Sequence, residues 1–398
     1  MAQGPVPRLM TLHAHWGHAS LLRALARARS EDSLPAALLI HGMKGVGKQH
    51  LALWLAKLLL CEAPTEAGPC DECHSCHLAG KLEHPDLHWY FPLSRPKKAN
   101  TPEKLAVALE EARGEALAEL RAKPLQVTFD NEPRSLYLAA ARSLRKKAQR
   151  RPSMGPCQVF IIAEAESLAP QESSSEAANA LLKLLEEPPA GTTLILTSAE
   201  PGRLLPTIRS RTTKLHVPPL TVAEVTEFLA SHTGLGDDEA SRVGRLSKGA
   251  IGRALGFLRE GEEPGPLEEI RAHALRLLSA ALAKEPEDAI QASMTFKPVG
   301  ARGLGDLFNF LEEGLADLAR TASGLPPEAG PMDEERFFEE VVQRWGIQPA
   351  WVPSAMRKVD EARALAAGNV NPQLLIFGLL HDLRKELANR DLSNREGT

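Results

Sequence analysis

The stretch Leu38–Lys48, LLIHGMKGVGK, constrains the fold of this chain more than any other part of the sequence. It is an apolar run that enters a glycine-rich turn and continues into the helix-forming stretch Gln49–Leu60. This order predicts a strand, a phosphate-binding loop and a helix, in which backbone N–H groups and the helix N-terminus face an anion. The pattern G-x-x-x-x-G-K predicts a phosphate site made of Gly42, Gly45, Gly47 and Lys48.

The residues that hold the metal ion in ATP-hydrolysing loops of this type are missing. After Lys48 the chain has Gln49, where the pattern requires a Ser or Thr hydroxyl for Mg²⁺. A second buried strand is predicted at Cys157–Ala163, and where such a strand normally ends in Asp-Glu, Ala163 is followed by Glu164. Because the metal ion contributes several kcal/mol to the transition state, we expect a loop that can hold ATP or ADP without hydrolysing it.

Four cysteines follow the predicted helix with the spacing C-x8-C-x2-C-x2-C. Thiolates this close in sequence can complete a tetrahedral Zn²⁺ shell and stabilise a segment too small for its own core. Four unrelated cysteines are the less favoured interpretation, and His74 or His77 could replace one thiolate. The fifth cysteine, Cys157, begins an apolar strand and is expected in the core. The predicted ligands of a structural zinc ion are Cys61, Cys70, Cys73 and Cys76.

Alternating strand and helix patterns predict a parallel α/β sheet in the first half of the chain. After Arg211 no β-like run of similar strength appears, and a capping box at Thr221–Glu224 opens a helix. We therefore expect an α/β core at 1–216 with a cysteine segment at 61–76 and an insertion at 92–133, a small helical unit at 217–262, a helical domain at 263–388 and a polar tail at 389–398.

The chain of 398 residues has a formal net charge of -4, which excludes a strongly basic protein. Any contact with nucleic acid must then come from a local patch. The stretch Arg134–Arg151 is rich in Arg and Lys and has no acid, so it is either a solvated helix face or such a patch. No apolar run reaches the roughly 18 residues of a membrane span, and no signal-peptide core is present. We expect a cytoplasmic protein without a membrane partner.

Arg211 lies in the stretch LLPTIRSRT, just after a third predicted strand at Thr193–Ser198. An arginine at this place can pair with a carboxylate of its own chain and be structural. It can instead reach the γ-phosphate bound by a neighbouring subunit, where an arginine finger is worth about 10³–10⁵ in rate. Both interpretations fit the sequence.

These residues together resemble the delta-prime subunits of bacterial DNA polymerase III clamp loaders, a branch of the AAA+ superfamily. The resemblance covers residues 38–255 well and continues into the C-terminal third only through NPQLL near Asn371. The stretches that carry it are His41–Lys48, Cys61–Cys76, HPD at 84–86, 176–198, LLPTIRSR at 204–211 and, more weakly, 247–255.

The resemblance implies an AAA+ P-loop module with a zinc-binding excursion, a helical lid at 217–262 and an all-α collar at 263–388 that assembles a ring. In that ring this chain would be a non-hydrolysing accessory subunit of the polymerase holoenzyme, and Arg211 would complete a neighbour's ATP site. Thr212 stands where the family motif has Cys, and Arg253 lies one position from the lid's sensor arginine. The implied partners are delta-like and gamma/tau-like subunits, with the sliding clamp and primed DNA reached through the complex.

Two other functions remain open. An ATP-hydrolysing gamma/tau-like subunit shares the zinc and arginine motifs, but it should keep Ser or Thr at position 49 and Asp-Glu at 163–164. A free-standing zinc and DNA-binding module would use the basic stretch Arg134–Arg151.

Overall fold

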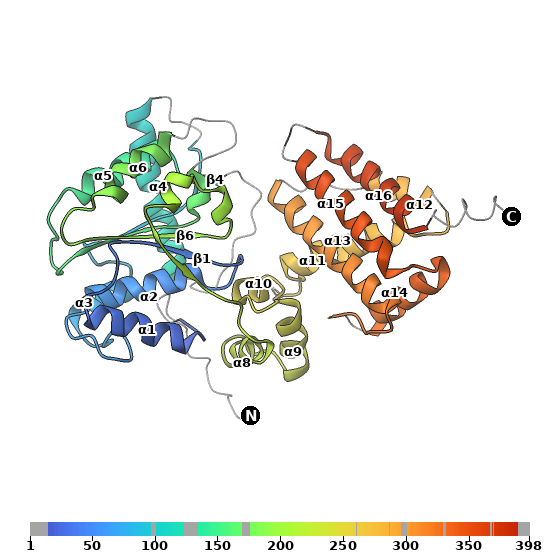
Figure 1. Cartoon of the computed structure of the whole chain (residues 1–398), viewed down its shortest axis with the longest axis horizontal. Helices are drawn as coiled ribbons and strands as arrows, with labels where there is room; N and C mark the ends of the chain where they lie inside the picture. The colour runs from blue at the N-terminus through green and yellow to red at the C-terminus, as the bar shows by residue number, and fades with distance from the viewer. Residues whose placement is uncertain are drawn as a thin grey trace. The chain divides into compact units, whose positions relative to one another are not determined.

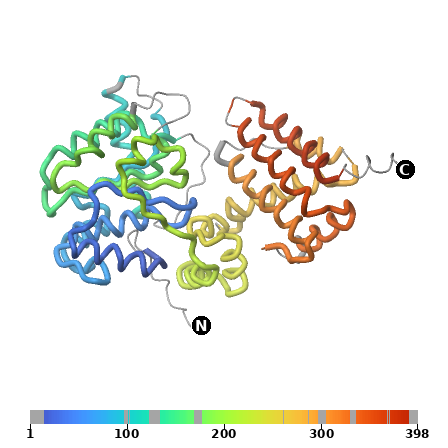
Figure 2. The backbone as a smooth tube through the Cα atoms, viewed as in Figure 1, coloured from blue at the N-terminus to red at the C-terminus, as the bar shows by residue number. Residues whose placement is uncertain are grey.

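The computed structural model describes residues 15–96, 101–122, 134–168, 176–259, 261–285, 287–295, 301–328, 332–366, 368 and 370–388. The described chain forms two compact units, the first ending at Leu255 and the second beginning at Gly256. Figures 1 and 2 show a mixed α/β unit and a helical unit. The predicted tail at 389–398 and parts of the predicted insertion lie outside the described residues.

A parallel sheet forms the centre of the first unit, as predicted. Its strands are β2 (Leu87–Tyr90), β5 (Gln158–Ile162), β6 (Thr192–Ser198), β1 (Ala37–His41) and β7 (Thr213–His216), in this spatial order. All four pairings are parallel, and β1 lies between β6 and β7. The carboxyl end of β1, where the phosphate loop begins, therefore lies inside the sheet next to the end of β6. A separate two-stranded ribbon joins β3 (Leu93–Ser94) to β4 (Arg134–Ser135).

Helices cover both faces of this sheet (Figure 1). Successive side chains of a strand point to opposite faces, so Leu38 and Ile40 of β1 pack with one helical layer and Leu39 with the other. The first layer contains α1 (Ala19–Ser30) and α2 (Lys48–Leu60), and α3 (His74–Gly80) packs on α2. The second layer contains α5 (Leu138–Ala148) and α6 (Glu176–Glu186). The insertion contributes α4 (Pro102–Ala122), which packs on α5.

The first unit ends in a small helical subdomain made of α8 (Val222–Thr233), α9 (Asp237–Leu246) and α10 (Ile251–Leu255). The predicted capping box opens α8: Glu224 N donates to Thr221 Oγ1 over 3.2 Å, and Thr221 N donates to the Glu224 carboxylate over 2.8 Å. Trp16, near the N-terminus, packs edge-on against Phe228 of α8 and donates to the Glu224 carbonyl over 3.1 Å. These contacts attach the start of the chain to this subdomain.

The second unit is built of helices, as predicted. Its central helix is α13 (Ala301–Ala322), whose Leu304, Leu307, Phe308, Leu311, Leu315 and Leu318 are buried at helical spacing. None of the described helices is long and apolar enough to cross a membrane. Three helices pack on α13: α11 (Pro266–Ala281), α14 (Met332–Trp345) and α15 (Val352–Ala366). The other two, α12 (Glu287–Met294) and α16 (Pro372–Ala388), pack on each other and on α11, and α16 also packs on α15.

Candidate phosphate loop, metal centre and arginine site

The predicted phosphate loop joins β1 to α2. Gly45 and Gly47 adopt φ angles of 82° and 99°, which glycine reaches without the steric cost that a side chain would add. Gly47 is the N-cap residue of α2, and Lys48 is its first residue. Helix α2 is nearly all buried beyond this point, so the apolar sequence that follows the loop anchors it against the sheet.

Lys48 is bonded to the loop itself. Its Nζ donates to the carbonyl oxygens of Gly42 over 2.9 Å and Met43 over 2.8 Å. Burial lowers the pKa of Lys48 to about 8, against the opposing effect of the carboxylates of Glu166 and Glu164. The Lys48 ammonium, which would bind a phosphate, is thus already hydrogen-bonded to two backbone carbonyls of the loop.

Residues from other parts of the first unit also contact the phosphate loop. Gly252 N of α10 donates to Gly45 O over 2.8 Å, and a Cβ on Gly252 would lie 2.9 Å from Gly45 Cα. The His15 ring lies 3.3 Å from the place that a Cβ of Gly47 would occupy. Nε2 of His15 is 3.0 Å from Nδ1 of His18, and the other ring nitrogen of His18, Nε2, is 2.8 Å from Pro218 O. The loop is therefore packed against the helical subdomain and against the N-terminal segment.

The carboxyl end of β5 has no metal-binding oxygen at the predicted position, since Ala163 is a fully buried methyl side chain. Glu164 follows with φ 48°, and its N–H donates to Thr197 Oγ1 over 3.2 Å. Sequence reasoning missed Glu166, whose Oε1 accepts from Ala199 N over 3.0 Å while its buried Oε2 has no hydrogen-bond partner. The only sequence signal for Glu166 was that it is the second acid after β5. His15 and Gly252 were also missed, because only the tertiary fold brings them to the loop.

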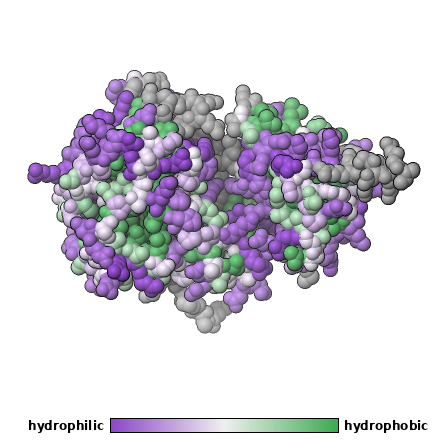
Figure 3. All heavy atoms as spheres, viewed as in Figure 1, coloured by the Kyte–Doolittle hydropathy of each residue, from purple (hydrophilic) through white to green (hydrophobic). Residues whose placement is uncertain are grey.

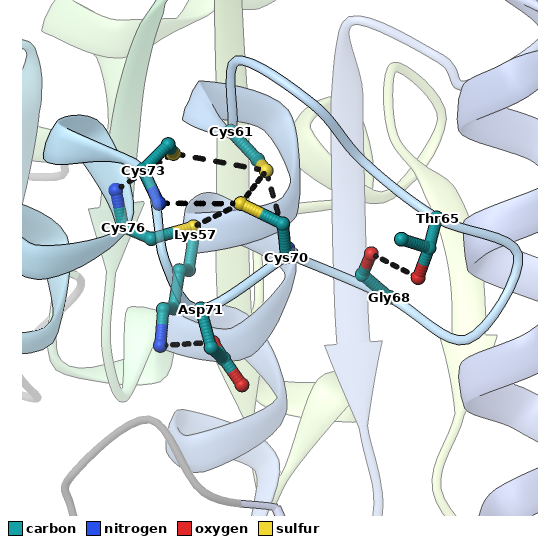
Figure 4. A network of polar contacts seen from close by, with 8 residues as sticks. All are labelled: Lys57, Cys61, Thr65, Gly68, Cys70, Asp71, Cys73 and Cys76. Atoms are coloured by element: carbon teal, nitrogen blue, oxygen red, sulfur yellow. Dashed lines mark hydrogen bonds and ion pairs between the residues drawn. The ribbon is translucent and has the colours of Figure 1, made fainter.

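The four predicted zinc ligands come together (Figure 4). Their sulfur atoms all lie within 4.8 Å of one another, with Cys61 3.4 Å from Cys70 and 4.0 Å from Cys73, and Cys70 3.9 Å from Cys76. A tetrahedral Zn²⁺ with Zn–S bonds of about 2.3 Å needs sulfur atoms roughly 3.8 Å apart. Among the described residues, neither predicted histidine belongs to this group. The four cysteines can therefore hold a metal ion without a histidine.

Two helix ends position the sulfur atoms. Cys61 follows the last residue of α2, and Cys73 is the N-cap of α3. Backbone N–H groups donate to three of the sulfurs over 3.3 to 3.4 Å, which favours thiolates. Backbone donors from Glu72 and Cys73 lower the pKa of Cys70 to about 6. An ion pair between Lys57 and Asp71 connects α2 to this segment (Figure 4).

Arg211 lies at the surface, two residues after α7 (Pro206–Arg209). Its guanidinium is 2.6 Å from the carboxylate of Glu186 at the end of α6, and Nη1 donates to Thr207 O over 3.0 Å. The side chain remains 33% exposed. The geometry thus provides the ion pair expected of a structural arginine and also leaves the guanidinium accessible to another molecule.

Two other residues at positions of family motifs, Thr212 and Arg253, form hydrogen bonds within the first unit. The buried Thr212, which stands where the family motif has Cys, donates its hydroxyl to Ile208 O over 3.1 Å. Arg253 of α10 donates from Nε to Leu246 O over 3.0 Å. Its side chain is thereby tied to the end of α9.

The chain is similar in sequence to several bacterial replication proteins. It is 33% identical over 210 residues to DNA polymerase III subunit delta' of Pseudomonas aeruginosa, covering 53% of this chain and 51% of the relative. It is 30% identical over 223 residues to DNA polymerase III subunit delta' of Escherichia coli, covering 56% and 54%. It is 29% identical over 214 residues to DNA polymerase III subunit tau/gamma of Haemophilus influenzae, covering 54% and 25%. The chain thus spans about half the length of the delta' relatives that it matches.

Solved structures resemble it only weakly. A DNA polymerase III gamma subunit-related protein of Thermotoga maritima gives a TM-score of 0.28 at 14% identity, covering 77% of this chain and 96% of that one. The sequence model of the family described as DNA polymerase III, delta subunit, matches residues 17–221, which is more than half of the chain. This chain belongs to the DNA polymerase III, delta subunit, family.

Proposed function

We propose that this chain is a delta-prime-like subunit of a DNA polymerase III clamp loader and takes part in DNA replication. In this function it assembles with delta-like and gamma/tau-like subunits, and it meets the sliding clamp and primed DNA through the complex. The observation that carries the proposal is a family match over the very residues that form a phosphate loop without metal ligands. The proposed location is the cytoplasm.

In this proposal the subunit does not hydrolyse ATP. Gln49 and Ala163 replace the hydroxyl and carboxylate ligands of Mg²⁺, so the ion would be held by neither of its usual protein groups. The bonds of Lys48 to Gly42 and Met43 support the same conclusion, because a phosphate would have to compete with them for the ammonium. ATP or ADP would bind here at most as a static ligand.

The catalytic contribution would come from Arg211, acting on ATP bound to an adjacent subunit. To do so the guanidinium would exchange its half-exposed partner Glu186 for a phosphate. Such surface ion pairs contribute about 0–1 kcal/mol, whereas an arginine finger lowers a barrier by ~4–7 kcal/mol. Breaking the ion pair between Arg211 and Glu186 would therefore cost much less free energy than the arginine finger would remove from the barrier.

Two further parts of the proposal concern assembly. Zn²⁺ bound by the four cysteines would be structural, because four protein ligands leave no open position for a substrate. The second unit would be the oligomerising collar. The face in view in Figure 3 is mostly hydrophilic with separate apolar patches, and α16 exposes 68% of Leu374 and 40% of Phe377. Exposed apolar side chains of this size favour burial against a partner subunit.

The second candidate is an ATP-hydrolysing gamma/tau-like subunit, favoured by the similarity to tau/gamma proteins. ATP turnover by the purified chain, measured with Lys48→Ala as the control, separates the two. Our proposal predicts no turnover by either protein. Turnover that disappears in the Lys48→Ala variant would establish the gamma/tau-like function instead.

A further inference from the structure

Two histidines lie side by side at the carboxyl ends of β1 and β7. His41 is the last residue of β1 and His216 is the last residue of β7, and the two are register partners in the parallel pairing of these strands. Their ring centres are 5.1 Å apart, and the ring planes are inclined by 43°. The fold therefore brings together two imidazoles that lie far apart in the sequence. We call them the His41–His216 pair.

The apolar neighbours of the two histidines show on which face of the sheet the rings lie. Ile40 and Leu215 are also register partners, and both pack in the helical layer of α1 and α2. Because side chains alternate along a strand, the His41–His216 pair lies on the opposite face. β7 is an edge strand, and His216 is exposed while His41 is half-buried. An ion in solution can therefore reach the pair at this edge of the sheet.

The separation of the rings is the one that a shared metal ion requires. Two imidazoles that bind one tetrahedral ion through nitrogen atoms about 2.0–2.1 Å away have ring centres roughly 5 Å apart. The observed distance of 5.1 Å agrees with this value. The torsion that turns an imidazole about its Cβ–Cγ bond has a broad minimum, so small rotations can aim one nitrogen of each ring at a common point.

The rings of this pair are not engaged in hydrogen bonds. Among the residues that the structure describes, neither His41 nor His216 has a side-chain hydrogen bond or an ion pair. A second histidine pair in the first unit differs in this respect. The rings of His15 and His18 are 5.2 Å apart, but a 3.0 Å contact joins a nitrogen of each ring to the other. Only the His41–His216 pair keeps its nitrogen atoms available for a ligand.

Charges near the pair limit the strength of metal binding. Burial, the His216 ring and two lysines lower the pKa of His41, so its imidazole is neutral at neutral pH, as a metal ligand must be. The two lysines, Lys214 and Lys48, also repel a cation. The effect of Lys48 is offset in part by the carboxylate of Glu166. We therefore expect a site that binds an ion more weakly than the four cysteines do.

The donor atoms decide which ions the pair can bind. Imidazole nitrogen suits Zn²⁺, Ni²⁺ and Cu²⁺, whereas Mg²⁺ and Ca²⁺ take oxygen ligands. Among the described residues, no third histidine, cysteine or carboxylate joins the pair. Two protein ligands leave the other coordination positions to water, so the ion would exchange readily.

We propose that His41 and His216 form a second metal site of this chain, which binds an exchangeable divalent transition-metal ion. β7 begins two residues after Arg211, so an ion shared by the pair would also fasten the edge strand next to that arginine. The inference goes beyond the proposed function and does not depend on it, because the site lies within one chain. Metal binding by the isolated chain and ATP turnover by a complex can therefore fail separately.

The test is Ni²⁺ binding by the full-length chain, measured by isothermal titration calorimetry. The four cysteines are first loaded with Zn²⁺, and elemental analysis after the titration checks that this zinc stays bound. His41→Ala, His216→Ala and the double variant are compared with His381→Ala, which removes an exposed histidine of α16. Circular dichroism checks that each variant is folded, and His216→Gln replaces His216→Ala if the alanine variant is not.

We expect the pair to bind one Ni²⁺ per chain, and each single variant to weaken this binding by about tenfold or more, because either change removes the chelate. The second substitution in the double variant should then cost much less affinity than the first. Ni²⁺ should also raise the thermal unfolding midpoint of the unchanged chain more than that of His216→Ala. His381→Ala should bind Ni²⁺ as the unchanged chain does.

Three results would overturn the proposal. The first is Ni²⁺ affinity that stays the same in both single variants. The second is an equal loss of affinity in His381→Ala, which would show that exposed histidines bind the ion without a specific site. The third is the loss of half of the bound Ni²⁺ in each single variant at unchanged affinity, because the two rings would then bind separate ions.

Discussion

Asp86 shows how one buried carboxylate can organise a loop far from it in sequence. It accepts three backbone hydrogen bonds, from Ser153 N over 2.6 Å and from Met154 N and Gly155 N over 2.8 Å. Burial alone would raise its pKa, but these three donors lower the pKa below the ordinary value. The HPD stretch at 84–86 is therefore structural, because its aspartate fixes the turn that leads into β5.

Replacing this carboxylate should destabilise the first unit. Asp86→Ala leaves three backbone donors without their acceptor, so we expect the free energy of unfolding to fall by about 2–4 kcal/mol. Because the pKa of Asp86 is lower in the folded chain, its stabilisation is present above the unfolded pKa and is lost as pH falls through the folded pKa. Urea unfolding at neutral and acidic pH measures both effects. The exposed Glu227→Ala is the control, and a loss that persists undiminished in acid would contradict the assignment.

Helices and strands were predicted where their own sequence determines them. The buried strands β1, β5 and β6 were expected because their side chains are apolar on both faces. The edge strands β2 and β7 were not predicted. β7 is mostly exposed, and Leu215 is its one apolar residue, so its sequence has no buried-strand pattern. The zinc ligands were predictable from close spacing along the chain. The contacts of His15 and Gly252 with the phosphate loop were not, because they join residues far apart in sequence.

The cysteine segment should depend on its metal. We expect one Zn²⁺ per chain by elemental analysis, and a marked loss of thermal stability when a chelator removes it, because Zn²⁺ stabilises the folded state by binding it. Cys73→Ser should lower zinc content and stability together, whereas Cys157→Ser, outside the cluster, should keep its zinc. A purified chain that contains no metal and is unaffected by chelation would refute the metal site.

The contact of α10 with the phosphate loop is testable by adding a single methyl group. A Cβ at Gly252 would lie 2.9 Å from Gly45 Cα, so Gly252→Ala should displace α10 and cost about 1–3 kcal/mol of stability. Hydrogen exchange of the loop amides should also become faster. At Gly202 a Cβ meets nothing within 4 Å, so Gly202→Ala is the matched control. Unchanged exchange at residues 42–48 would show that α10 does not restrain the loop.

At the scale of the whole molecule, two differently built units belong to one chain. The first has a parallel sheet with a phosphate-loop motif but has neither the hydroxyl nor the carboxylate ligand of Mg²⁺ at positions 49 and 163, and its loop is packed against its own helical subdomain. Its accessible arginine, Arg211, lies at the surface just after α7. In the proposed function this combination suits a subunit that positions a catalytic group for a neighbour, and the helical second unit would serve its assembly.

The most direct test is ATP turnover by a clamp-loader complex reconstituted from this chain and the gamma/tau-like and delta-like subunits proposed as its partners. We predict that Arg211→Ala leaves assembly intact and lowers turnover at the site it completes by about 10³-fold or more, while Arg203→Ala, an exposed and paired arginine nearby, changes nothing. Lys48→Ala in this chain should also leave turnover unchanged. Full turnover by an assembled Arg211→Ala complex would contradict the account.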